Sequence, residues 1–318
     1  MPNLMLTNWC NYKCPYCFGI DRMSPKVEAH AMSDDTFLGI LDWLDRTNYR
    51  APIHLMGGEP TLHPKFEWFV STLIERGFPI TIFSNLATDK APEYADKLSI
   101  LPIKWVVNVN NPKNWNNTQR RNIESALSVL GKNAAITFNI MPDGSDDYWA
   151  IDLIRRFNLS KTIKVGFILP TVTNSNYSLT DDEYLTVAEK TVKLAQECDR
   201  FGITLQYECG VPTCAFTPEQ LGILWKCGSR LNSGCCSRLD ITPHGEVIYC
   251  LPLATVGQRM YNEFANYTEA KRWFEGRFLP YRKLGRTINC ATCNLMTPDK
   301  CHGACLAKNL IGAKNVKI

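Results

Sequence analysis

Three cysteines near the N-terminus are the residues best suited to chemistry. Cys10, Cys14 and Cys17 follow a CxxxCxxC spacing, with an aromatic residue directly before the last cysteine. Three thiolates on one short loop can ligate three irons of a cubane cluster and leave the fourth iron without a protein ligand. An open metal position is where an exogenous ligand binds and reacts. The alternative is a zinc site with a distant fourth ligand, but zinc sites favour paired CxxC units.

The run Gly57, Gly58, Glu59 and Pro60 is the second feature with a chemical use. It directly follows the apolar, strand-like segment 53–56. Two glycines let the backbone approach a ligand closely, so that exposed N–H and C=O groups can grip an amino-acid moiety. Taken alone, the run also fits an ordinary turn, because glycine pairs before proline are common in turns.

All of the remaining cysteines lie in the last 121 residues of the chain. The chain has 14 cysteines in 318 residues, and 11 of them follow residue 197. They are Cys198, Cys209, Cys214, Cys227, Cys235, Cys236, Cys250, Cys290, Cys293, Cys301 and Cys305. The N-terminus lacks a signal peptide, which indicates a cytoplasmic protein whose thiols stay reduced. So many reduced thiols favour bound metal over disulfides. Without the front motif, the tail run from Cys290 to Cys305 would suit a tetrahedral zinc site.

The segments between the two cysteine groups predict the elements that position them. Up to about residue 204, short β-type runs alternate with amphipathic helical segments. The strands are expected at residues 4–7, 53–56, 80–83, 105–109, 135–140 and 164–169, and the helices at residues 34–44, 66–74, 92–98, 119–130, 148–157 and 181–201. Six β-then-α units predict an α/β fold with a parallel sheet and outer helices, as a full or partial barrel. Both front motifs follow strands, so both should meet at the carboxyl ends of the strands, where function belongs.

The pattern changes after residue 205. A hairpin is expected from residues 238–242 and 246–249, and a helix from residues 269–274. This part has few regular elements, so bound metal should replace part of the missing core. We therefore divide the chain into residues 1–205, a partial barrel, and residues 206–318, a small cysteine-rich domain.

Composition excludes several classes of protein. Hydrophobic residues make up 45% and charged residues 21%, as in a protein with a sizeable core. The net charge of +4 and the lack of basic–aromatic clusters argue against nucleic acid as a partner. No apolar run reaches the ~18 residues of a membrane span. We therefore expect neither nucleic acid nor membrane as a partner.

The two front motifs together resemble the radical S-adenosylmethionine (radical SAM) superfamily. The resemblance covers residues 4–205 and implies a partial (β/α)6 barrel of the TIM type. It implies that Cys10, Cys14 and Cys17 ligate a 4Fe–4S cluster whose open iron takes the amino and carboxylate groups of S-adenosylmethionine. One electron, from a flavodoxin- or ferredoxin-type donor, would cleave the sulfonium and give a 5′-deoxyadenosyl radical. That radical would remove hydrogen from an unactivated carbon of the substrate.

The resemblance also implies further contacts with S-adenosylmethionine. Residues 57–60 would contact its amino group, and Tyr16 matches the family's aromatic position beside the cluster and adenine. Polar residues at the ends of successive strands often meet the carboxylate or ribose in this family. Here they are Ser84, Asn85, Asn108, Asn110 and Asn139. Each of them alone also fits a polar residue that caps a loop.

The rear cysteines resemble an auxiliary-cluster domain called SPASM, or its shorter relative called twitch. Cys235, Gly245 and Cys250 fit the first half of its pattern. The second half departs twice, because seven residues replace five between Cys293 and Cys301 and no cysteine follows Cys305. The resemblance implies one or two auxiliary 4Fe–4S clusters, with ligands among Cys227, Cys235, Cys250, Cys290, Cys293, Cys301 and Cys305.

Several assignments among the rear cysteines stay open. A missing ligand would come from Cys209, Cys214 or Cys227. One of Cys235 and Cys236 must point away from a shared metal if both lie on an extended segment. Cys198, on a predicted helix, suits a packing role. A spare rear thiol could donate hydrogen and make the protein an epimerase.

The sequence names a substrate class only by the frequency of functions within the family. Peptide modification, as in the maturation of ribosomally made peptides, is the leading hypothesis. A radical SAM epimerase or dehydrogenase acting on a sugar or another small metabolite is the alternative, and a non-catalytic zinc-binding protein is the remote one. The loops 111–117 and 170–176 should discriminate between substrates. The chain starts almost at its first strand, so we expect no preceding module for a leader peptide.

Overall fold

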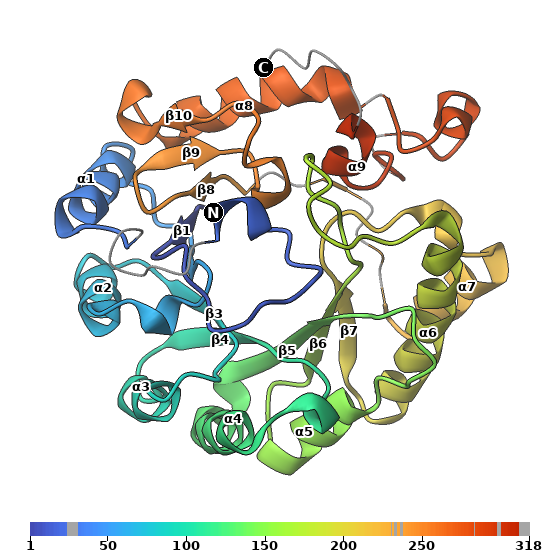
Figure 1. Cartoon of the computed structure of the whole chain (residues 1–318), viewed down its shortest axis with the longest axis horizontal. Coiled ribbons are helices and arrows are strands. Elements are labelled where there is room, and N and C mark those ends of the chain that lie inside the picture. Colours follow the sequence, from blue (N-terminus) through green and yellow to red (C-terminus); the bar gives the residue numbers. More distant parts are fainter. Residues whose placement is uncertain are drawn as a thin grey trace.

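A computed structural model describes residues 1–23, 31–229, 231, 234–235, 238–282, 284–297 and 300–311. The strands of the described part form one sheet in the order β10-β9-β8-β1-β2-β3-β4-β5-β6-β7. Neighbouring strands from β1 to β7 pair in parallel. The sheet curves into an open ring with helices on its outside (Figure 1).

The six predicted β-then-α units are all present, so the predicted fold class is confirmed. The strands are β1 (Asn3–Met5), β2 (Ile53–Met56), β3 (Ile80–Ser84), β4 (Ile103–Asn108), β5 (Ala134–Asn139) and β6 (Thr162–Gly166). The helices after them are α1 (Asp34–Asp45), α2 (Phe66–Glu75), α3 (Ala91–Leu98), α4 (Asn117–Leu130), α5 (Trp149–Phe157) and α6 (Asp181–Arg200). A seventh strand, β7 (Thr204–Tyr207), extends the parallel sheet beside β6 and was missed by the sequence analysis.

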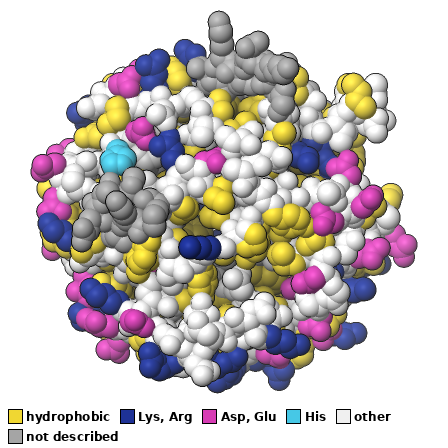
Figure 2. Space-filling view, in the orientation of Figure 1, with side chains coloured by type: hydrophobic (Ala, Val, Ile, Leu, Met, Phe, Trp, Pro, Cys, Tyr) yellow, Lys and Arg dark blue, Asp and Glu magenta, His cyan; other side chains and the backbone are white. Residues whose placement is uncertain are grey.

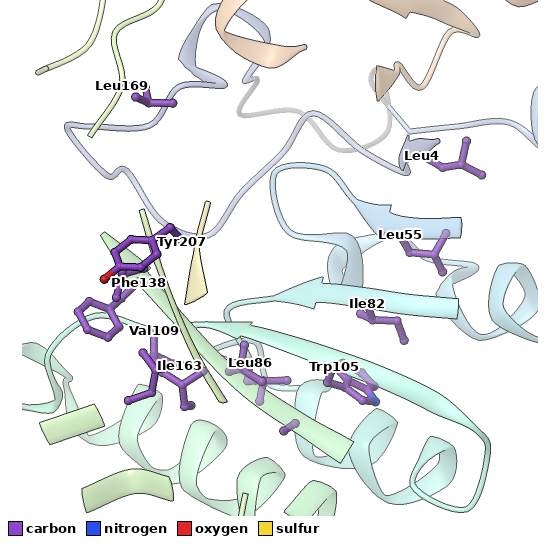
Figure 3. Close-up of a cluster of buried hydrophobic side chains, with 14 of the residues drawn as sticks. Leu4, Leu55, Ile82, Leu86, Trp105, Val109, Phe138, Ile163, Leu169 and Tyr207 are labelled. Carbon is purple, nitrogen blue, oxygen red and sulfur yellow. The ribbon is translucent and has the colours of Figure 1, made fainter. Parts of the chain in front are cut away.

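Successive side chains of each strand point to opposite faces of the sheet. Those on the outer face form an apolar layer against the helices, and those on the other face point into the ring. Leu4, Leu55 and Ile82 on successive strands pack into one buried cluster with the helices (Figure 3). The apolar layer continues through Trp105 and Ile163 on β4 and β6. Burial of this layer is the main stabilising term of the ring. The residues between these positions face inward, and many of them are polar.

Caps fix where the helices begin. The Ser33 side chain accepts a hydrogen bond from the backbone N–H of Thr36 at the start of α1, which confirms the predicted cap. Helix α6 begins with a reciprocal pair in which Thr180 and Glu183 each bond the other's backbone N–H. Such caps satisfy orphan donors of the first turn.

The C-terminal part of the chain continues the same sheet. Strand β8 (Asp240–Ile241) pairs in parallel with β1, and β9 (Glu246–Ile248) and β10 (Arg259–Met260) follow as antiparallel strands, so the predicted hairpin is confirmed. The remaining helices are α7 (Pro218–Lys226), α8 (Tyr267–Arg282) and α9 (Leu306–Leu310). The predicted boundary between residues 205 and 206 lies inside β7 and stays a prediction.

One buried cluster joins the ring to the C-terminal part. It contains Leu4 and Ile163 of the ring together with Ile241 and Phe274. The indole N–H of Trp43 on α1 also donates to the carbonyl of Phe264, 2.9 Å away. Among the described residues, no helix combines the length and apolar character needed to cross a membrane.

Candidate metal and cofactor site

The front cysteines lie on the loop that follows β1. This loop crosses the centre of the ring in Figure 1, where it is drawn in dark blue. The Gly58 N–H donates to the Thr7 carbonyl at 2.8 Å, and the Glu59 N–H donates to the Trp9 carbonyl at 2.9 Å. A Cβ at Gly58 would lie 2.2 Å from the Trp9 carbonyl oxygen and 2.8 Å from the Cys10 nitrogen. The glycine run therefore holds the start of the cysteine loop by direct backbone contact.

The three front thiols share a desolvated environment. The pKa of Cys10 is raised to about 12, mainly by burial and in smaller part by the negative charges of Glu59, Cys14 and Cys17. Burial also raises the pKa of Cys14 and of Cys17, and a charge on Cys14 adds to the effect at Cys17. Thiolates that repel one another in this way fit a cationic iron cluster, because bound iron supplies the missing positive charge.

The described part of the chain holds no group of three His, Cys, Asp or Glu side chains arranged to bind a single metal ion. A cubane binds each thiolate through a different iron, so its ligand sulfurs stand farther apart than those around one ion. Both the repulsion between the front thiolates and their sulfur donors fit a multi-iron cluster.

Amide and phenol groups surround the front thiols. The Tyr12 N–H points to the Cys10 sulfur at 3.4 Å. The Asn85 side-chain amide lies 4.0 Å from that sulfur and donates to the Asn11 side chain at 2.8 Å. The Tyr16 hydroxyl donates to the Asn110 side chain at 2.5 Å. The structure therefore brings the predicted Tyr16, Asn85 and Asn110 to the cysteine loop.

Glu59 faces the protein interior. Its carboxylate accepts hydrogen bonds from the Thr61 N–H at 3.1 Å, the Thr61 hydroxyl at 2.7 Å, the Ser84 hydroxyl at 2.8 Å and the Asn85 N–H at 2.7 Å. The residue is only 1% exposed. Glu59 and Ser84 therefore tie the ends of β2 and β3 together, and they position the loops that carry Gly58 and Asn85.

We expect Glu59→Gln to destabilise the protein even without cofactor. The new amide NH2 must face at least one backbone or hydroxyl donor, which leaves a buried donor without an acceptor. The expected loss is about 2–4 kcal/mol in the free energy of unfolding, measured by urea titration of the cofactor-free protein. Glu93→Gln, which removes a carboxylate on the surface of α3, is the control and should change little. Unchanged stability of Glu59→Gln would contradict the positioning role.

A second loop, which follows β6, also contacts the cysteine loop and forms a clamp on it. The Asn176 side-chain amide donates to the carbonyls of Tyr16 at 3.2 Å and Leu169 at 2.9 Å, and its oxygen accepts from the Thr171 N–H at 2.8 Å. The Tyr177 N–H donates to the Pro15 carbonyl at 2.9 Å. The loop 170–176, for which the sequence predicts a role in substrate discrimination, thus also positions the front cysteines.

A cavity of about 340 Å³ occupies the interior of the ring. Its polar wall comes from inward-facing residues of β4 to β7 and the residues after them, namely Asn108, Thr137, Asn139, Lys164, Gln206 and Glu208. A Cβ at Gly166 would lie 2.4 Å from the Asn139 side-chain oxygen, so this glycine makes room for the Asn139 amide. In the space-filling view of this face, hydrophobic side chains surround the central hollow (Figure 2). The predicted Asn108 and Asn139 therefore face a common space.

A buried polar chain forms part of the cavity wall. The His54 ring Nδ1 lies 2.9 Å from the Asn3 side-chain oxygen, the Asn3 amide donates to Asp240 at 2.5 Å, and Asp240 accepts from the Leu251 N–H at 2.7 Å. Burial raises the pKa of Asp240 to about 7. Burial, together with the nearby charges of Arg238 and Lys164, lowers the pKa of His54 to about 3.

The depressed pKa of His54 predicts a loss of stability in acid. The unfolded chain takes up a proton below about pH 6.5, whereas the folded protein keeps His54 neutral until about pH 3. Stability from this group is therefore complete above pH 6.5 and is lost as the pH falls. At pH 4.5 the difference amounts to about 2–3 kcal/mol.

Urea unfolding at pH 7 and pH 4.5 measures this effect. His54→Gln should lose less stability between the two pH values than the unmodified chain does. His244→Gln, which changes an exposed histidine, is the control. An equal loss in the His54→Gln variant and the unmodified chain would contradict the prediction.

Four rear cysteines gather on the cavity wall: Cys209, Cys235, Cys250 and Cys305. Burial raises the pKa of Cys250 well above its usual value, and the charges of Cys235, Cys305 and Cys209 contribute. The Cβ of Cys305 would lie 3.2 Å from a Cβ at Gly210, which places it against the segment after Cys209. Cys209, one of the three candidates for a missing ligand in the sequence, thus belongs to this set, hereafter the cavity thiols.

The other rear cysteines lie elsewhere. Cys290 and Cys293 sit at one tight turn, because the Cys293 N–H donates to the Cys290 carbonyl at 3.2 Å. Cys227 ends α7, where the charge of Asp199 helps burial to raise its pKa. A charge on Cys227 also helps to raise the pKa of Cys198. Cys198 is buried on α6, in agreement with the predicted packing role. The structure therefore places Cys227 apart from the cavity thiols, and Cys236 lies outside the described residues.

The N-terminal third of the chain matches known proteins in sequence. Residues 4–110 match the model of the Radical SAM superfamily. The S-adenosylmethionine-dependent nucleotide dehydratase of Selenomonas ruminantium is 34% identical over 87 residues, which are 26% of this chain and 28% of that protein. The match thus spans little more than a quarter of this curated relative.

Solved structures resemble the chain over nearly its whole length. The enzyme anSMEcpe with bound AdoMet and Kp18Cys peptide has a TM-score of 0.67 at 16% identity, over 96% of this chain and 89% of that one. Streptococcus suis SuiB bound to precursor peptide SuiA has a TM-score of 0.65 at 14% identity, over 99% and 73%. At these identities the likeness concerns the fold. Residues 4–110 thus match the Radical SAM superfamily, as the two front motifs predict, and a cysteine-rich region follows the partial barrel.

Proposed function

We propose that this protein cleaves S-adenosylmethionine reductively and abstracts hydrogen from a carbon atom of its substrate. The observation that carries the proposal is the set of three half-buried thiols, Cys10, Cys14 and Cys17, on a loop held by the backbone of Gly58 and Glu59. These thiols would hold a 4Fe–4S cluster. When bound, the cluster and S-adenosylmethionine supply the one-electron chemistry, and the protein supplies placement.

The chain's own residues account for placement and for exclusion of water. Tyr16 and Asn110 lie beside the cysteine loop, and Asn108 and Asn139 offer amide groups to the cavity. Apolar side chains such as Phe18, which also line the cavity, limit the access of water to the reacting groups. The substrate would therefore bind between the front loop and the cavity thiols.

We propose a peptide as the substrate, in a maturation reaction of ribosomally made peptides. Two proteins of similar fold have been solved with peptides bound, which supports this choice. The alternative is an epimerase or dehydrogenase acting on a sugar or another small metabolite, and the matching segment of a nucleotide dehydratase supports a small molecule. In either case the electron would come from a flavodoxin- or ferredoxin-type donor in the cytoplasm, and neither nucleic acid nor membrane would take part.

Anaerobic reconstitution tests the proposal. The protein, loaded with iron and sulfide and reduced with dithionite, should convert S-adenosylmethionine to 5′-deoxyadenosine, measured by liquid chromatography and mass spectrometry. Iron and labile sulfide per chain should be close to equal. Near-zero labile sulfide together with tightly held zinc would contradict the proposal and support the non-catalytic zinc protein. A deuterated candidate peptide that transfers deuterium to 5′-deoxyadenosine would establish the substrate class.

A further inference from the structure

We infer that Cys214 joins Cys290, Cys293 and Cys301 in a second rear metal site, separate from the four cavity thiols. The rear region then holds two four-thiol sites, each suited to a 4Fe–4S cluster. This inference rests on the iron–sulfur chemistry of the proposed function. It selects Cys214 from the three candidates for a missing ligand that the sequence leaves open, and it separates the rear cysteines into two sets.

Cys305 is separate from the other cysteines of the tail run. Cys301 and Cys305 are close in sequence, but Gly303 and Ala304 between them both have left-handed backbone conformations, with φ of 75° and 67°. Such a pair is uncommon, particularly at alanine, and it reverses the chain locally. Cys305 therefore faces the cavity with Cys209, Cys235 and Cys250, and three cysteines of the tail run remain.

The three remaining cysteines of the tail run belong to one compact loop. A Cβ at Gly303 would lie 2.7 Å from the Cα of Gly285, so the two segments of the loop that contain these glycines are in contact. A Cβ at Gly285 would lie 2.8 Å from the Cys290 sulfur. The segment of Cys301 is thus packed against the segment that leads to Cys290 and Cys293.

Cys214 lies beside this loop. Cys214 lies in a short helical turn, Thr213–Ala215, and the Thr213 hydroxyl donates to the Lys300 carbonyl at 3.4 Å. The direct chain neighbours of Cys214 and Cys301 are therefore in contact. The electrostatic surroundings of Cys214 agree with this position. Burial raises the pKa of Cys214, a nearby Arg286 opposes this, and the charges of Cys301 and Cys290 raise it again.

A buried cation, Arg286, lies near Cys214 and Cys290. The Arg286 side chain is only 7% exposed, forms an ion pair with Asp181, and lies over the Tyr184 ring at 4.6 Å. Its Nε has no hydrogen-bond partner among the described residues. A buried donor without an acceptor calls for an unseen partner, and a sulfide or thiolate of a bound cluster is one that also balances the charge.

Cys227 is the competing candidate for this ligand, and its position argues against it. It ends α7 and interacts electrostatically with Asp199 and Cys198. It therefore serves as a matched control, since Cys214 and Cys227 are both rear cysteines outside the cavity thiols.

The experiment uses the full chain with Cys10, Cys14 and Cys17 all changed to alanine, so that every bound iron reports on the rear sites. After anaerobic reconstitution we expect about eight irons per chain and no three-iron cluster signal after mild oxidation. Adding Cys214→Ala should lower the iron to seven or fewer and should give the electron paramagnetic resonance signal of a three-iron cluster. Adding Cys227→Ala instead should leave the iron content unchanged and should give no three-iron signal.

Two results would overturn the inference. One is a Cys214→Ala protein with the same iron content and no new signal. The other is a rear region that holds about four irons before Cys214 is changed, or zinc in place of the second cluster. Because the front cysteines are absent from this test, its failure is distinct from failure to form 5′-deoxyadenosine in the unmodified chain.

Discussion

Cys14→Ala is expected to abolish formation of 5′-deoxyadenosine. Cys14 is the middle thiol of the front loop, and its removal leaves two thiolates for a cluster that needs three protein ligands in this arrangement. The reconstituted variant should lose about four irons and about four sulfides per chain. Product formation is measured by chromatography after reduction with dithionite, and protein folding is checked by circular dichroism.

The matched control is Cys198→Ala, which also removes a desolvated thiol but one that packs on α6 away from the front loop. That variant should keep its iron and its product formation at a modest cost in stability. Wild-type levels of 5′-deoxyadenosine from Cys14→Ala would rule out the front loop as the metal site.

Gly58→Ala should disrupt the same site through the backbone. The added Cβ would lie 2.2 Å from the Trp9 carbonyl oxygen and 2.4 Å from the Trp9 carbonyl carbon. Both are main-chain atoms, so no side chain can rotate away to relieve the overlap. The two hydrogen bonds that hold the cysteine loop must then lengthen. We expect the free energy of unfolding to fall by about 3 kcal/mol or more, and the front cluster to be lost.

Urea unfolding of the cofactor-free protein and its iron content after reconstitution measure these two effects. Gly276→Ala is the control, because a Cβ there meets nothing within 4 Å and the residue lies inside α8. Alanine at that position should be neutral or should stabilise the helix by up to about 1 kcal/mol. If Gly58→Ala unfolds like the unmodified chain, the glycine run does not hold the loop.

The sequence predicts the parts of the site that depend on local order. The spacing of Cys10, Cys14 and Cys17 and the glycines at 57 and 58 are visible in a short window, and hydrophobic alternation indicates the strands that precede them. The role of Glu59 is not visible in this way, because its partners Ser84 and Asn85 are on the next strand. From the sequence alone, a glutamate with a buried carboxylate cannot be distinguished from one whose carboxylate is exposed and binds a ligand.

The clamp and the rear ligand sets depend on contacts between distant segments. Asn176 meets the carbonyl of Tyr16 across 160 positions of the chain, and no local pattern marks such a pair. The rear spacing suggests that Cys301 and Cys305 act together, yet the left-handed residues between them direct the thiols to different places. Ala304 gives no signal of this conformation, since alanine seldom adopts it.

The pairing of β8 with β1 has a consequence for any attempt to study the barrel alone. Strand β1 is covered on one side by β2 and on the other by β8. A fragment that ended at residue 205 would lack β8, and the N–H and C=O groups of β1 on that side would be left without partners. Uncovered strand edges invite pairing with other chains. By pairing with β1, the cysteine-rich region prevents self-association of the sheet at the strand that precedes the front cysteines.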